Sequence, residues 1–176
     1  QGNVDAIYFN EKLYIGKREE VFVYNESTGN FDLYYHLAGK DITLSCLHLD
    51  EKKNLWMGTT SNGLYCLSGD KKISQPVTRG NIASIYEDSS KELWICTWEE
   101  GLYRIKTDGT IENFRHDPKN PNSICADFVR SCCEDNAGNL WIGTFHGLNR
   151  YEKSTGKFQL YTANANKPDG LTHSSI

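Results

Sequence analysis

The feature that most constrains this chain is a short segment that recurs along it. A Leu-Trp pair followed by two residues and Thr occurs at 55–59, 93–97 and 140–144, and a divergent copy with Tyr14 in place of Trp stands at 13–16. An Asp lies six residues before each Trp, and a Gly-Leu pair begins six or seven residues after it. Intervals of 42, 38 and 47 residues between copies indicate an array of one supersecondary unit. The three pairs are Asp50 with Trp56, Asp88 with Trp94, and Asp135 with Trp141.

The interior of the third copy shows what this unit is. Its runs 82–87, 93–97, 102–105 and 110–114 are rich in β-branched and aromatic residues, and short polar turns separate them, which is typical of strands. A helical period of apolar residues is not sustained anywhere in the chain. The Asp108-Gly109 pair predicts a type I′ hairpin turn. We therefore expect each unit to be an antiparallel meander of four strands.

One four-stranded sheet cannot bury both of its faces, so the copies must stack face to face. Four strands per repeat and a recurring Trp are typical of a β-propeller. We therefore predict an all-β protein, a β-propeller of four four-stranded antiparallel blades. The Trp is expected to fill the space between neighbouring blades, which is worth roughly 2–3 kcal/mol. The Asp is expected to accept backbone N–H groups in the turn before the Trp, and its register in three copies favours an architectural role over a catalytic one.

The fourth copy carries a longer pattern. Residues 129–150 read Val-Arg-Ser-Cys-Cys-Glu-Asp-Asn-Ala-Gly-Asn-Leu-Trp-Ile-Gly-Thr-Phe-His-Gly-Leu-Asn-Arg. This pattern resembles the two-component regulator propeller repeat of sensor ectodomains in hybrid histidine kinases of Bacteroidetes. The first copy departs from it, with Tyr14 for Trp and Val21-Phe22 for Gly-Leu, and Cys96 replaces a Gly in the third.

The resemblance implies what the parent protein does. Such proteins combine two propellers, a β-sandwich near the membrane, one membrane span and cytoplasmic kinase and response-regulator parts. Their periplasmic ectodomains sense oligosaccharides, and the full propeller ring has seven blades. The resemblance thus implies a periplasmic, ligand-sensing segment that has no catalytic activity of its own and signals to a cytoplasmic histidine kinase.

The repeat boundaries predict the domain organisation. Residues 1–176 are expected to form part of a propeller, with blades at about 3–40, 41–79, 80–120 and 121–168, and with 169–176 opening the next repeat. We expect an arc of a larger ring, without a signal peptide and without membrane contact, because no apolar run approaches the roughly 20 residues of a membrane helix. An arc leaves two blade faces uncovered. The expected partners are therefore the remaining blades and sensor domains of the parent receptor, and a second copy in a homodimer.

Composition excludes two classes of partner or site. The net charge is −4, and Lys and Arg are scattered, whereas a nucleic-acid partner would require a basic face. The six cysteines stand at non-equivalent places of the repeat and form no paired C-x-x-C pattern. We therefore expect reduced, mostly buried thiols, with no structural metal, no cofactor and no periodic disulfides.

Variable loops are the expected site of binding. In a propeller the loops between the second and third strands of each blade, and those between blades, gather at one end. Here these loops vary and combine aromatic with amide, carboxylate and guanidinium groups, which suit a sugar ring and its hydroxyls. The candidate ligand residues are Asn62, Arg79, Trp98, Glu99, His116, Phe145 and His146.

Other interpretations of the same residues stay open. Trp98 and Phe145 occupy corresponding loop positions, so they could have a structural role that the repeats share, which is to cover the edge of a blade. The chain could be an architectural or protein-interaction propeller with no ligand of its own. A propeller lyase or hydrolase would need a clustered acid and base, and the adjacent Glu99 and Glu100 lack a partner across a cleft. We expect no enzymatic activity.

Overall fold

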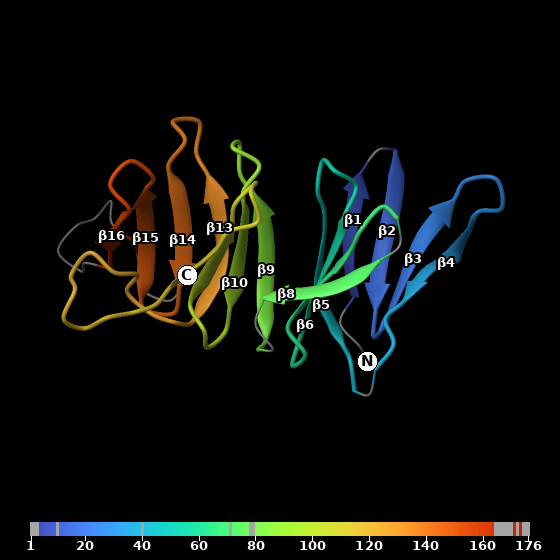
Figure 1. The fold of residues 1–176 in the computed structure, drawn as a ribbon, viewed down its shortest axis with the longest axis horizontal. Coiled ribbons are helices and arrows are strands. Elements are labelled where there is room, and N and C mark those ends of the chain that lie inside the picture. The colour runs from blue at the N-terminus through green and yellow to red at the C-terminus, as the bar shows by residue number, and fades with distance from the viewer. Residues whose placement is uncertain are drawn as a thin grey trace. The chain divides into compact units, whose positions relative to one another are not determined.

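A computed structural model of the protein describes residues 4–9, 11–39, 41–70, 72–77, 80–163, 171 and 173. In this part of the chain every regular element is a strand. The strands form four sheets, and each sheet contains four strands that follow one another in the sequence (Figure 1). Paired neighbours run antiparallel. The predicted all-β fold of four four-stranded blades is confirmed.

Each blade comprises four strands. The first blade contains β1 (Val4–Phe9), β2 (Lys12–Lys17), β3 (Glu20–Asn25) and β4 (Asn30–His36). The second contains β5 (Leu44–Leu49), β6 (Leu55–Thr59), β7 (Leu64–Leu67) and β8 (Ile73–Val77). The third contains β9 (Ile82–Glu87), β10 (Leu93–Thr97), β11 (Leu102–Ile105) and β12 (Ile111–Phe114). The fourth contains β13 (Val129–Glu134), β14 (Leu140–Thr144), β15 (Gly147–Glu152) and β16 (Lys157–Tyr161).

The chain divides into two compact units, residues 1–85 and 86–176, with the boundary inside β9. In the first unit, β1 and β2 contact β5, so the first blade packs on the second. In the second unit, β10 contacts β13, so the third blade packs on the fourth. In both units consecutive blades therefore meet through their first two strands, as blades around a common axis do. No helix of the described residues is long and apolar enough to cross a membrane.

The recurring aromatic residue is buried in the first three blades. Trp94 is 0% exposed, and Trp56 and Tyr14 are each 8% exposed. Tyr14 thus occupies the position that Trp takes in the other copies, as predicted. Trp141 of the fourth blade is only half-buried, although its immediate sequence is the best match to the repeat. This difference must come from what packs on the blade and not from the local sequence.

The repeated Asp has the predicted architectural role, and the structure adds a contact to it. Asp88 accepts backbone N–H groups from Ser90 and Glu92 at 2.9 and 3.0 Å. Its other carboxylate oxygen accepts the indole N–H of Trp94 at 2.9 Å. The same indole bond joins Asp50 to Trp56 at 2.9 Å and Asp135 to Trp141 at 2.8 Å. Each Asp therefore ties the first turn of its blade to the Trp ring of the same blade.

The hairpin at Asp108-Gly109 forms, but the predicted turn type is wrong. A type I′ turn needs positive φ at both central residues. Only Gly109 has it, at 86°, and Asp108 is not among the residues with positive φ. The turn is closed by Gly109 N donating to Lys106 O, and Lys106 N donating to Thr110 O, each at 2.9 Å. The Asp108 carboxylate accepts Thr110 N at 2.8 Å, which stabilises the loop without requiring left-handed backbone at Asp108.

Candidate functional site

Three aromatic rings form a row on the loops of the third and fourth blades. Trp98 and Phe145 are 39% and 54% exposed. Phe128 lies between them, with ring centroids 4.6 Å from Trp98 and 5.4 Å from Phe145. The ring of His146 lies 5.9 Å from that of Phe145. We call Trp98, Phe128 and Phe145 the aromatic row. It contains two of the predicted candidates, Trp98 and Phe145, and a third, His146, lies beside it.

Phe128 was missed in the sequence because its position is polar in the preceding copies. It directly precedes β13, where the second and third copies have Thr43 and Asn81. The backbone role of the position is nevertheless repeated. Phe145 N donates to Phe128 O at 3.2 Å, and Thr60 N donates to Thr43 O at 2.9 Å. The repeat therefore brings these two loops together, and the fourth copy places an aromatic ring on each.

The loops that carry the row are held by their own threonines. Thr97 Oγ1 donates to Gly101 O at 2.7 Å and accepts Glu100 N at 2.9 Å. Thr144 Oγ1 donates to Gly147 O at 2.8 Å in the same way. Both threonines are fully buried. Because the bases of the loops are tied down, the rings at their tips are presented to solvent without the ordering cost of a mobile loop.

Polar groups flank the row at its Trp98 end. The Arg115 guanidinium donates to the Asp127 carboxylate at 2.7 Å and to Glu99 O at 3.2 Å. His116 contributes its backbone N–H to Asp127 at 2.7 Å, and its Nδ1 lies 3.0 Å from Ile124 O. His116 is therefore partly committed to shaping its loop. The Arg115 side chain is 51% exposed, and its guanidinium contacts the backbone of Glu99 beside the row.

The structure does not place the other two predicted residues, Asn62 and Arg79, relative to the row. Asn62 belongs to the unit of residues 1–85, where its backbone N–H donates to Thr59 Oγ1 at 2.9 Å and its side chain accepts Ser61 Oγ at 2.8 Å. Arg79 lies outside the described residues. The structure therefore brings together Trp98, Glu99, Phe145 and His146, with His116 in the adjoining loop.

Two cavities lined by described residues do not include the aromatic row. A cavity of about 520 Å³ lies at the turns of the first blade, and one of about 390 Å³ lies at the edge of the fourth. Neither is lined by the row or by the predicted residues that the structure describes. The first is lined by Glu11, Lys12, Val23, Tyr24, Asn25, Glu26 and Asp32, and the second by Pro121, Asn122, Arg150, Glu152, Lys157, Phe158 and Gln159.

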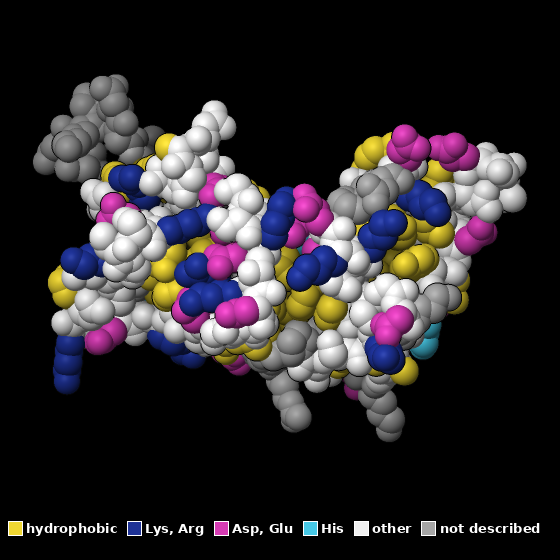
Figure 2. Space-filling model, turned by 45° about the horizontal axis from the view of Figure 1, so that its top comes forward, with side chains coloured by type: hydrophobic (Ala, Val, Ile, Leu, Met, Phe, Trp, Pro, Cys, Tyr) yellow, Lys and Arg dark blue, Asp and Glu magenta, His cyan; other side chains and the backbone are white. Residues whose placement is uncertain are grey.

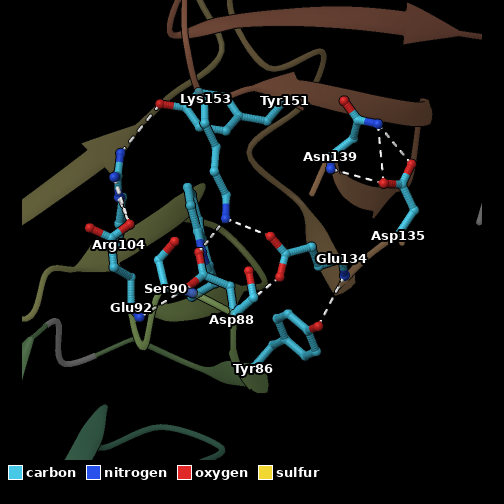
Figure 3. A network of polar contacts seen from close by, with 12 residues as sticks. Tyr86, Asp88, Ser90, Glu92, Arg104, Glu134, Asp135, Asn139, Tyr151 and Lys153 are labelled. Atoms are coloured by element: carbon cyan, nitrogen blue, oxygen red, sulfur yellow. Dashed lines mark hydrogen bonds and ion pairs between the residues drawn. The ribbon is translucent and has the colours of Figure 1, made fainter. Parts of the chain in front are cut away.

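A buried cluster of charges joins the third and fourth blades (Figure 3). Lys153 Nζ lies 2.9 Å from Asp88 and 2.7 Å from Glu134. Glu134 also accepts Ser89 N at 2.7 Å, and its own N–H donates to Tyr86 Oη at 3.1 Å. The Asp88 and Glu134 side chains are 0% and 7% exposed. Because these groups satisfy one another within the interface, the cluster has a structural role.

The surface charge is mixed. Figure 2 shows Lys and Arg side chains interspersed with Asp and Glu on the visible face of each unit. Among the described residues, no group of three or more His, Cys, Asp or Glu side chains is placed to hold a metal ion.

Residues 123–146 match the family model described as "Two component regulator propeller", which confirms the predicted resemblance in the fourth copy of the repeat. No curated protein matches the chain in sequence.

Solved structures with the same arrangement include both sensors and enzymes. The extracellular domain of a putative hybrid two component system from B. thetaiotaomicron is 22% identical, with a TM-score of 0.65 over 95% of this chain and 22% of that one. That of a putative one component system from the same organism is 19% identical, with a TM-score of 0.67 over 97% and 30%. Virginiamycin B lyase from Staphylococcus aureus is 17% identical, with a TM-score of 0.73 over 94% and 57%. At these identities the likeness shows the fold, and the chain spans little more than half of the lyase.

Proposed function

We propose that the chain is a ligand-sensing segment of the extracytoplasmic sensor of a hybrid two-component system, and that it binds an oligosaccharide on the aromatic row. The observation that supports this most is the row itself, in which Trp98 and Phe145 are exposed on anchored loops of adjoining blades. Contiguous exposed aromatic rings on loops of a rigid scaffold are typical of interaction surfaces.

The chemistry beside the row suits a sugar. Pyranose rings offer an apolar face to an aromatic ring and hydroxyl groups to polar partners. Glu99 and Arg115 supply a carboxylate and a guanidinium at one end, and His146 supplies an imidazole at the other. An open row of three rings suits several sugar units in line better than a single small molecule, which would need an enclosed pocket.

Signalling would pass through the blades as a rigid body. The Lys153 cluster and the packed rings between the third and fourth blades hold the two blades together, so a ligand that spans the row would act on both. The proposal includes a parent receptor with this segment in the periplasm and a kinase domain in the cytoplasm. In that receptor, the bound ligand would shift the arrangement of the remaining sensor domains.

Calorimetric titration of the chain with a panel of oligosaccharides from dietary and host polysaccharides tests the proposal. We expect one member of the panel to bind, and Trp98→Ala and Phe145→Ala each to weaken binding about tenfold, which corresponds to roughly 1.4 kcal/mol. Ile111→Ala is the matched control, because Ile111 is 42% exposed on β12, away from the loops of the row, and should leave the affinity unchanged.

Two results would favour the other functions. Unchanged affinity in the Trp98→Ala and Phe145→Ala variants, with their unfolding midpoints intact, would make this segment architectural or a protein-interaction surface. Recovery of a chemically altered oligosaccharide after incubation would instead favour a propeller lyase or hydrolase.

A further inference from the structure

Two of the six cysteines meet where the third blade packs on the fourth. Cys96 on β10 is fully buried, and Cys132 on β13 is half-buried. Their thiol groups are hydrogen-bonded to each other, and the strands β10 and β13 are in contact. Both residues belong to the unit of residues 86–176, so this contact is internal to one compact unit.

The alternation of side chains along β10 turns Cys96 toward the fourth blade. Cys96 lies two residues after Trp94, so both side chains leave the same face of the third blade. The Trp94 ring contacts Tyr151 of the fourth blade, with ring centroids 5.4 Å apart. The Cys96 thiol therefore faces the fourth blade as well.

The same argument turns Cys132 toward the third blade. Cys132 pairs with Ile142, and Tyr151 pairs with Leu140. Ile142 and Leu140 are two residues apart on β14, so all four side chains leave one face of the fourth blade. Because Tyr151 contacts the third blade, the Cys132 thiol points into the same interface.

Both cysteines are departures from the repeat. The position of Cys96 is occupied in the other copies by Gly16, Gly58 and Gly143. The position of Cys132 is occupied by Leu47 in the second copy and by Ile85 in the third. A larger residue has thus replaced Gly on one side of the contact, and a smaller one has replaced a branched apolar residue on the other side.

The first and second blades show how closely these two positions approach. A Cβ at Gly16 would lie 3.3 Å from Leu47 Cγ and 3.2 Å from Leu47 Cδ1. In a cysteine, Sγ takes the place of Cγ. A disulfide bond joins Cβ atoms that are about 3.8 Å apart. The corresponding interface therefore brings the two positions to the separation at which two bonded sulfurs can join them.

We propose that Cys96 and Cys132 are a site of oxidative modification, at which a disulfide bond joins the third blade to the fourth. The oxidant is an organic disulfide. One protein thiolate attacks a sulfur of this reagent and expels a thiolate, and the other then attacks the protein sulfur of the mixed disulfide and expels the second thiolate. The two cysteines lose two electrons and two protons, and the reagent is reduced to two thiols that take up the protons.

Two neighbouring cysteines are engaged differently. Cys133 is exposed, and it leaves the face of β13 opposite to that of Cys132. Cys125 Sγ lies 3.1 Å from Thr144 Oγ1 and accepts Asn149 Nδ2 at 3.1 Å. The geometry therefore favours Cys132 as the partner of Cys96.

The bond would hold together the strands that lead into the aromatic row. Cys96 directly precedes Thr97, whose hydroxyl anchors the loop of Trp98, and Phe128 directly precedes β13. The bond also closes a loop of residues 96–132, which restricts the unfolded chain. Oxidation should therefore stabilise the folded protein.

Refolding tests the proposal on the full chain, because the unfolded chain gives the oxidant access to both thiols. The reduced protein is unfolded in urea and diluted into buffer with oxidised and reduced glutathione. Two of the six thiols should then no longer react in denaturant. The thermal unfolding midpoint of the oxidised protein should lie about 5–10 °C above that of the reduced protein.

Cys133→Ser is the matched control, because Cys133 adjoins Cys132 but leaves the opposite face. Trypsin cleaves after Lys and Arg, so peptides 92–104 and 131–150 contain the two proposed partners. In the oxidised Cys133→Ser variant these peptides should be recovered joined, and reduction should separate them. Cys96→Ser and Cys132→Ser should each lose both the joined peptides and the rise in midpoint.

Midpoints of the reduced variants show whether each of them folds. Six reactive thiols in the refolded wild type would overturn the proposal, and so would a rise in midpoint that persists in Cys96→Ser. Joined peptides that involve other cysteines would overturn it equally. If the Cys96→Ser and Cys132→Ser variants do not fold, the peptide map of Cys133→Ser decides alone, because that variant retains both proposed partners.

Discussion

Lys153 of the fourth blade places its ammonium nitrogen 2.9 Å from the buried carboxylate of Asp88 on the third. The same Asp88 oxygen accepts the indole N–H of Trp94. The Asp that each copy uses to anchor its own Trp is thus, in this blade, also the anion of an ion pair between blades. Glu134 shares the same cation at 2.7 Å, so one lysine compensates two carboxylates in a largely dry interface.

Replacing Lys153 by Met should destabilise the protein strongly. The variant leaves Asp88 and Glu134 buried without their cation, and breaking a buried pair in this way costs about 3–5 kcal/mol. Lys72→Met is the control. Lys72 forms an ion pair with Asp70 at 2.9 Å, but both side chains are mostly exposed, so the expected loss of stability is much smaller than for Lys153. Urea unfolding measures the free energy of unfolding of both variants. Equal losses relative to the wild type would show that the Lys153 cluster is not effectively buried.

The same cluster predicts how stability depends on pH. Burial disfavours the charged form of all three groups, but their hydrogen bonds outweigh it, so the pKa values of Asp88 and Glu134 are lowered and that of Lys153 is raised. The contribution of the carboxylates is therefore fully present above their unfolded pKa values of about 4 and is lost as pH falls through the lower folded values. That of Lys153 is fully present below about pH 10.4 and is lost as pH rises through its folded pKa.

We therefore expect the stability difference between wild type and Lys153→Met to be constant from about pH 5 to 9 and to shrink below about pH 4. Urea midpoints of both proteins, measured across this range, test it. A difference that grows as the solution is acidified would contradict the assignment.

Two glycines with similar φ should respond differently to Ala. Gly101, at φ 78°, would place a Cβ 2.2 Å from the backbone oxygen of Phe114, whereas Gly109, at φ 86°, has open space around it. Gly109→Ala should cost about 1 kcal/mol from left-handed backbone alone. Gly101→Ala adds a clash with backbone and should cost about 3 kcal/mol. Thermal unfolding distinguishes them, and similar shifts in Tm would show that the loop before β11 can relax.

The six cysteines should differ in reactivity under native conditions. Cys133 is exposed on β13 and should react first with a thiol reagent. A hydrogen bond with Cys96 and burial raise the pKa of Cys132, and burial raises that of Cys66 to about 11, so these thiols should react slowly. Cys133→Ser should remove the fast phase. In denaturant without reductant most of the six should titrate, and a count below three would instead indicate an oxidised, cross-linked chain.

Much of the fold and part of the site could be read from the repeat. The spacing of Asp88 and Trp94 predicts a turn and a buried ring, because hairpin hydrogen bonds and side-chain alternation depend on nearby residues. Trp98 and Phe145 could be selected for the same reason, since they follow the repeated Thr of the second strand. Phe128 could not, because its equivalents are polar and its role depends on two loops that meet only in the folded blade pair.

The packing between blades was decided by tertiary structure alone. Trp94 and Trp141 stand in nearly the same local sequence, but the first is fully buried and the second is not. The bond between Asp88 and Lys153 likewise joins two turns that no local pattern pairs. Local sequence specifies which way a side chain points from its sheet. Whether that side chain loses contact with water depends on which blade is stacked upon it, and both burial and ion pairing between blades follow from that stacking.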